Sequence, residues 1–117
     1  NATGPNYRMT MSTMLGAIGS IVDSDYSIAW IPEQFLEQQN VAPWSDMPTW
    51  IPGDPLSFVS IERAVAAGLT FRTVEQTAQD TLMWDKGRPE EERQNRQAGL
   101  SRERESEIID AWENRSR

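Results

Sequence analysis

The chain has 117 residues, enough to bury about two thirds of its unfolded surface and to build one modest core. Its formal net charge is −7, from 18 acidic and 11 basic side chains, and such a surface repels phosphate backbones, so nucleic acid is not an expected partner. The absence of Cys and His excludes disulfides, thiolate and imidazole metal sites, a Cys nucleophile and the Ser-His-Asp triad.

The first predicted element is a helix that follows a turn-forming leader at residues 1–6. Thr10 or Ser12 can accept the free backbone N–H groups of its first turn. The apolar side chains of this helix form one continuous stripe, made of Met11, Met14, Leu15, Ile18, Ile21 and Val22. Gly16 and Gly19 weaken it by up to about 1 kcal/mol each relative to Ala. We therefore expect another backbone to pack closely at these glycines.

Residues 26–31, with the sequence Tyr-Ser-Ile-Ala-Trp-Ile, alternate with a period of two. This alternation predicts a half-buried β-strand. Pro32 ends the strand and suits the first position of a helix. We expect that helix to run through about Gln39, with Phe35 and Leu36 on its buried side.

The loop from residue 40 to residue 55 combines rigid and large apolar residues. It contains four of the seven prolines, together with Trp44, Met47 and Trp50. Two interpretations stay open. Prolines can hold large, flat side chains at low entropic cost, which suits an apolar wall that shapes a substrate pocket. Alternatively, the two tryptophans complete the core of a small lobe.

Residues 60–87 carry the strongest local signals, after a short strand that we predict at residues 56–59. Ser60 can cap a first short helix, and Gly68 can take the left-handed conformation that closes it. Thr73 and Gln76 have the spacing of a capping box and begin a second helix. That helix stops at a Gly-Arg-Pro sequence and carries one apolar stripe, formed by Val74, Ala78 and Leu82.

The remainder of the chain divides into a linker and a helix. Residues 88–99 are charged and Gln-rich without apolar periodicity, which predicts an exposed linker. Residues 101–114 place Ile108, Ile109 and Trp112 on one helical face, which docks weakly or mediates self-association. We thus expect a lobe at residues 1–87, a charged linker at 88–99 and an amphipathic helix at 100–117.

Predicted strands alternate with predicted helices along the chain. We expect about four to five helices and two or three short strands, without an internal repeat or a sustained heptad. This alternation predicts an α+β (mixed α/β) lobe and not a helical bundle.

The block at residues 60–87 resembles the C-terminal end of extended short-chain dehydrogenases/reductases, the NAD-dependent epimerase/dehydratase family. There, too, a short helix runs into a Gly-Leu/Phe-type connector and then into a helix that ends in an aromatic-rich turn. The Asn-Ala-Thr-Gly sequence at residues 1–4 resembles the family's Asn-x-x-Gly segment, which leaves the nucleotide-binding sheet and enters the substrate lobe.

The resemblance implies an enzyme of which this chain is one part. The intact protein would bind NAD or NADP through an upstream Rossmann domain and perform reduction, epimerisation or dehydration on a small organic substrate, with a sugar nucleotide as one candidate. In the family this lobe lies over the nicotinamide and provides the substrate-specific wall. The resemblance therefore implies that Trp44, Met47 and Trp50 bind substrate.

The chain lacks the catalytic machinery that such an enzyme needs. The family binds its dinucleotide at a Gly-rich turn between a strand and a helix, but Gly16 and Gly19 fall inside a helical pattern. The family's proton donor is the Tyr of a Tyr-x-x-x-Lys pair, and neither Tyr7 nor Tyr26 has Lys at that spacing. We therefore expect no catalytic, cofactor-binding or metal-binding residues in this chain.

Together these patterns predict the substrate-binding C-terminal domain of an NAD(P)-dependent oxidoreductase, epimerase or dehydratase, inactive without its upstream Rossmann domain. The expected partners are a small-molecule substrate, that upstream domain and a second copy in a homodimer, with the cytoplasm as the default compartment. No apolar run approaches the roughly 20 residues that span a bilayer, so we expect no membrane partner. The alternative is a stand-alone acidic module that binds another protein.

Overall fold

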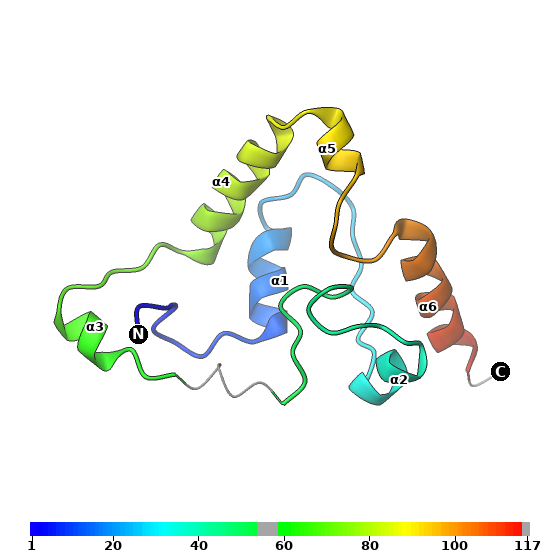
Figure 1. The fold of residues 1–117 in the computed structure, drawn as a ribbon, viewed down its shortest axis with the longest axis horizontal. Coiled ribbons are helices and arrows are strands. Elements are labelled where there is room, and N and C mark those ends of the chain that lie inside the picture. The colour runs from blue at the N-terminus through cyan, green and yellow to red at the C-terminus, as the bar shows by residue number, and fades with distance from the viewer. Residues whose placement is uncertain (54–58, 116–117) are drawn as a thin grey trace. The chain divides into compact units, whose positions relative to one another are not determined.

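The computed structural model describes residues 1–53 and 59–115, which form six helices joined by turns and irregular segments (Figure 1). In chain order, the helices are α1 (Met11–Gly19), α2 (Glu33–Gln38), α3 (Glu62–Ala66), α4 (Val74–Lys86), α5 (Glu90–Gln94) and α6 (Arg102–Asn114). The longest are α4 and α6, with 13 residues each.

The predicted α+β fold class, with two or three short strands, is wrong, because the protein is mostly helical. Helices account for 46% of the described residues and strand for 2%, and these residues form no sheet. The strand content is an isolated bridge between Pro43 and Met47. It joins two turns of one loop and builds no larger element.

The strand predicted at residues 26–31 has no regular secondary structure. The side chains that were to lie on one face of it, Tyr26, Ile28 and Trp30, are all exposed. A strand needs a second strand to satisfy its backbone hydrogen bonds, and the described residues supply none. The other predicted strand, at residues 56–59, lies outside the described residues except for Val59, which is also irregular.

The helices predicted from capping signals at Thr10 and Thr73 are confirmed. Thr10 is the N-cap of α1, and its hydroxyl accepts a hydrogen bond from the backbone N–H of Thr13 at 3.1 Å. At the start of α4, the backbone N–H of Gln76 donates to the Thr73 hydroxyl at 3.2 Å, while the Gln76 side chain accepts from the Thr73 N–H at 3.0 Å. Each cap satisfies backbone groups that the first helical turn leaves free.

The short helix α3 ends as its glycine predicts. Gly68 has φ 99°, in the left-handed region that is accessible to Gly without strain. Its N–H donates to Val65 O at 3.0 Å, and the N–H of Leu69 donates to Ala64 O at 2.9 Å. These two bonds form a Schellman motif, which closes the helix by satisfying its last carbonyl groups.

The chain forms two compact units, each built from two segments of sequence. The first unit comprises Asn1–Tyr26 and Pro55–Arg93, and contains α1, α3 and α4. The second comprises Ser27–Asp54 and Gln94–Arg117, and contains α2 and α6. The predicted division at residues 87 and 99 stays a prediction, although the segment predicted as a linker contains α5.

The first unit packs α1 against α4 without enclosing a core. None of its described side chains is buried. The apolar stripes of the two helices are instead half-buried, among them Ile18 on α1 and Val74, Ala78 and Leu82 on α4. The facing sides of α1 and α4 therefore retain apolar surface that reaches solvent.

The second unit has the small hydrophobic core of the described chain. Leu36, Val41 and Ile108 are buried, and Ile108 on α6 is only 2% exposed. Phe35 and Trp112 meet edge to face, with ring centroids 5.0 Å apart. These contacts anchor α6 in the core through Ile108, whereas the sequence predicted at most weak docking. Self-association through this helix stays a prediction.

Candidate functional site

A groove runs along α1 and α4 within the first unit, and we call it the α1/α4 groove. It has a volume of about 790 Å³, within the range of roughly 300–1,000 Å³ that is typical of small-molecule sites. Four segments line it: the leader, the last turns of α1 with the residues that follow, the connector at residues 70–73, and α4. All four belong to one compact unit.

The α1 side of the groove is purely apolar. Met14 and Ile18 come from the helix, and Ile21 and Val22 from the turn that continues it. The N–H of Ile21 donates to Ile18 O at 3.1 Å, which extends the helical path past Gly19 and keeps these side chains on the same stripe. The stripe predicted from the sequence thus forms one wall.

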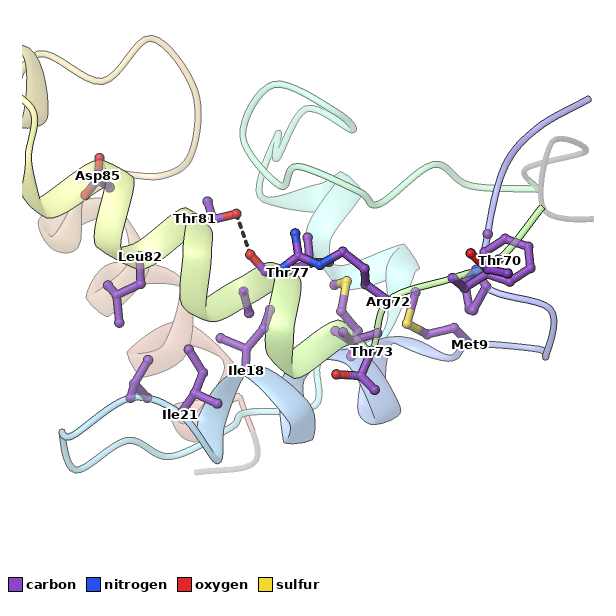
Figure 2. A pocket seen from close by; sticks show the side chains of 17 residues that line it. Met9, Ile18, Ile21, Thr70, Arg72, Thr73, Thr77, Thr81, Leu82 and Asp85 are labelled. Carbon is purple, nitrogen blue, oxygen red and sulfur yellow. Dashed lines mark hydrogen bonds between the residues drawn. The ribbon is translucent and has the colours of Figure 1, made fainter. Parts of the chain in front are cut away.

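The α4 side presents two parallel rows of side chains. The apolar row is Val74, Ala78 and Leu82, and the polar row is Thr73, Thr77, Thr81 and Asp85. Members of each row are four residues apart, which places them one above another on the helix. Figure 2 shows Leu82 pointing toward the side of the groove that carries Ile18 of α1 and Ile21 of the turn after it, whereas Thr81 and Asp85 lie along the other edge of α4. The groove therefore has an apolar floor and a hydroxyl-bearing rim.

Two of the rim hydroxyls already make one hydrogen bond each within α4. The Thr73 hydroxyl accepts from the Gln76 N–H, so its own O–H remains able to donate. The Thr81 hydroxyl donates to Thr77 O at 2.7 Å, shown as the dashed line in Figure 2, so its oxygen remains able to accept. The rim thus offers a donor near the start of α4 and an acceptor about two turns further along.

The charged side chains that line the groove are Arg72 and Asp85, and each has a partner of opposite charge. Arg72 forms an ion pair with Asp80. Asp85 pairs with Arg88 at 3.0 Å and with Arg93 at 3.5 Å. Because both charges are compensated locally, the described lining presents no uncompensated positive or negative group.

Close contact between the leader and the connector shapes one end of the groove. A side chain added at Gly4 would meet the ring of Phe71, so the glycine is what lets the aromatic ring lie against the leader backbone. Both residues line the groove. The Asn-Ala-Thr-Gly segment and the connector of the 60–87 block are therefore neighbours in space.

The residues that the sequence predicted for substrate binding lie in the second unit and have different environments. Met47 and Trp50 pack against the core cluster of Leu36, Val41 and Ile108. Trp44 is 67% exposed. The structure thus brings two members of the predicted set into the core and leaves the third on the surface, while substrate binding by the three stays a prediction.

The loop that carries these residues is held by its own backbone. The Trp44 N–H donates to Trp50 O at 3.1 Å, and the Asp46 carboxylate accepts from the Ala42 N–H at 2.8 Å. Trp44 has φ 68°, a left-handed conformation that is uncommon for a bulky residue. The loop is therefore tightly folded, with the Trp44 ring displayed on its outside.

The sequence does not predict the groove or its threonine rim. It predicts the apolar stripes of both helices, but nothing in either stripe indicates that the two helices face each other. A usable signal was present in α4, because Thr73, Thr77 and Thr81 recur at every fourth residue. Such spacing places three hydroxyls on one side of a helix.

The groove contains no arrangement that predicts catalysis by itself. Within residues 1–53 and 59–115, no three acidic side chains come together as a potential metal site. The pKa of Glu103, at the start of α6 in the second unit, is lowered below its usual 4.5 by a backbone hydrogen bond and then by the Ser101 hydroxyl. That carboxylate stabilises a helix N-terminus, which is a structural role.

Comparisons with protein-family models, curated proteins and solved structures give no match to this chain. In the part of the chain that the structure describes, no helix has both the length and the apolar character needed to cross a membrane.

Proposed function

We propose that this chain is the substrate-binding C-terminal lobe of an NAD(P)-dependent oxidoreductase, epimerase or dehydratase, and is inactive without an upstream Rossmann domain. The α1/α4 groove is the observation that carries the proposal. One of its walls is α4, the second helix of the 60–87 block whose sequence resembles that enzyme family. The groove has the size of a small-molecule site and the polar groups to orient a ligand.

Local geometry in the 60–87 block agrees with the pattern on which the resemblance rests. The Schellman motif at Gly68 closes a short helix, the connector follows, and the capping box at Thr73 begins a longer one. The leader, which carries the second resembling segment, lies against this connector through Gly4 and Phe71. Two segments far apart in sequence therefore contribute to one groove.

In this proposal the groove binds and orients substrate while the chemistry takes place on the upstream domain. The apolar walls remove water from the substrate, and the threonine rim fixes its direction through hydrogen bonds. Proton transfer and hydride transfer would use the cofactor and the Tyr-x-x-x-Lys pair of the upstream domain. The groove thus contributes to KM and to substrate choice.

Calorimetric titration of NAD⁺ and NADP⁺ into this chain tests whether cofactor binding resides on the upstream domain and not on this lobe. We expect no saturable heat, because residues 1–53 and 59–115 contain no Gly-rich turn at a helix N-terminus to hold the pyrophosphate. Saturable binding of either cofactor by the chain would contradict the proposal. The gene sequence immediately upstream of the Asn1 codon gives a second test, since the proposal expects a Gly-x-x-Gly-x-x-Gly turn and a Tyr-x-x-x-Lys pair there.

A second candidate function, an acidic protein-binding module, is favoured by one surface feature. Met83 and Trp84 are adjacent on α4 and both are about two thirds exposed, at 66% and 64%. Neighbouring exposed apolar side chains are typical of contact surfaces. A start codon directly before Asn1, or an unrelated domain there, would favour this candidate over the enzyme lobe.

A further inference from the structure

The chemical class of the substrate can be inferred from the charges and hydroxyls of the groove, an inference that rests on the proposed function. We propose that the α1/α4 groove binds an uncharged, mainly apolar small molecule that carries a carbonyl or hydroxyl group, and that it disfavours phosphorylated ligands such as sugar nucleotides.

The apolar floor of the groove favours a ligand with a large apolar portion. Ile18 on α1 and Leu82 on α4 both line the groove, and both are only half-buried. Covering the remaining apolar surface is favourable by about 25 cal/mol per Å². A ligand with an alkyl chain or a carbon ring gains this energy, whereas a sugar bearing many hydroxyls must give up hydrogen bonds to water on the same surface.

The charges of the groove argue against a phosphorylated ligand. A diphosphate carries about two negative charges that need compensating cations or many N–H donors when water is removed. Arg72 is the one base among the described lining residues, and it is already paired with Asp80. Asp85, further along α4, adds a carboxylate to the lining. A neutral ligand needs no compensation and disturbs neither ion pair.

The threonine rim determines which polar group of the ligand can be bound. The free O–H of Thr73 suits a carbonyl or hydroxyl oxygen, and the free lone pairs of Thr81 suit a donor such as a hydroxyl. Hydroxyls orient a neutral group without attracting an ion. The threonine rim therefore favours a ligand that is apolar except for one polar group next to the rim.

A competition experiment with three probes of one chain length tests the charge preference. Nile red, an uncharged dye whose fluorescence rises in apolar sites, is bound to the 117-residue chain and displaced by 1-octanol, octanoate or octyl phosphate, each below the concentration at which it aggregates. We expect 1-octanol to displace the dye at concentrations about tenfold lower than either anion. Equal or better displacement by octyl phosphate would overturn the proposal, as would the absence of dye binding.

Matched variants on α4 test whether the groove is the site. Ala78 is part of the floor, and Ala78→Phe fills the groove. Gln79, the next residue, is exposed and does not line the groove, so Gln79→Phe adds the same ring elsewhere. We expect Ala78→Phe to raise the Nile red Kd by about tenfold and Gln79→Phe to change it by less than about twofold.

Folding is checked by the helical circular dichroism of each variant. If Ala78→Phe loses this signal, Ala78→Met, a smaller addition at the same position, replaces it. A similar Kd in the Ala78 and Gln79 variants would place the dye outside the groove and overturn the proposal.

These outcomes are distinguishable from failure of the proposed function. Binding of NAD⁺ by the chain would contradict the proposal that it is a substrate-binding lobe, but would not affect the inference that the groove prefers 1-octanol to the anions. Preference for octyl phosphate would remove the neutral-ligand inference and leave the substrate-lobe proposal intact, with a phosphorylated substrate in its place.

Discussion

At the scale of single residues, the two glycines of α1 have different roles. The expectation that another backbone packs closely at both is wrong. A Cβ at Gly16 would meet nothing within 4 Å, whereas a Cβ at Gly19 would meet the side chain of Tyr26. The lack of a side chain at Gly19 therefore leaves space for the Tyr26 ring, whereas no neighbour among the described residues requires a glycine at position 16.

This difference predicts opposite effects of one substitution. Gly16→Ala should raise the free energy of unfolding by up to about 1 kcal/mol, because Ala is the better helix former and no atom opposes its methyl group. Gly19→Ala should lose that gain, since Tyr26 must move. Urea unfolding of the two variants measures both effects, and equal stabilisation would show that Tyr26 does not pack on Gly19.

Capping residues were predictable because their physics is short-range. Thr73 and Gln76 satisfy each other's backbone groups within four residues, so the sequence contains all that the motif requires. The same is true of Thr10 and Gly68. The half-burial predicted for the strand at residues 26–31 is wrong for Tyr26 and Trp30, which are exposed. That prediction depended on a pairing strand elsewhere in the chain, which the local sequence cannot show.

At the scale of elements, the helices were predicted better than their neighbours. Apolar periodicity indicates which face of α1 or α4 is covered, but not which helix covers it. The groove follows from that pairing, and so it could not be deduced from either stripe. The loop with two tryptophans shows the same limit, since its composition left a pocket wall and a core equally open.

The two tryptophans of that loop have different environments, so the core interpretation applies to Trp50 and not to Trp44. Trp50→Ala should lower the free energy of unfolding by about 3 kcal/mol or more, because Trp50 packs on the core cluster of the second unit. Trp44→Ala, at an exposed position, should change it by less than about 0.5 kcal/mol. Chemical denaturation followed by circular dichroism measures both values. A large loss in the Trp44 variant would mean that its ring is part of the core after all.

At the scale of the whole molecule, the two units differ in how they are stabilised. The second unit has buried residues from α2, α6 and the loop between residues 40 and 53. The first has none among its described residues and keeps apolar surface along α1 and α4. A groove lined mainly by apolar side chains is typical of a small-molecule site. This contrast supports the assignment of ligand binding to the first unit and of scaffold to the second.

The central proposal is that ligand binds in the α1/α4 groove; the sequence-based prediction instead places substrate at the two-tryptophan loop. Amide chemical shifts of the ¹⁵N-labelled chain, recorded during titration with 1-octanol, test it directly. We predict the largest shifts in α1 and the turn after it and in α4 between Val74 and Leu82, with residues 44–50 unchanged. Shifts concentrated at residues 44–50, with α1 and α4 unchanged, would contradict the claim.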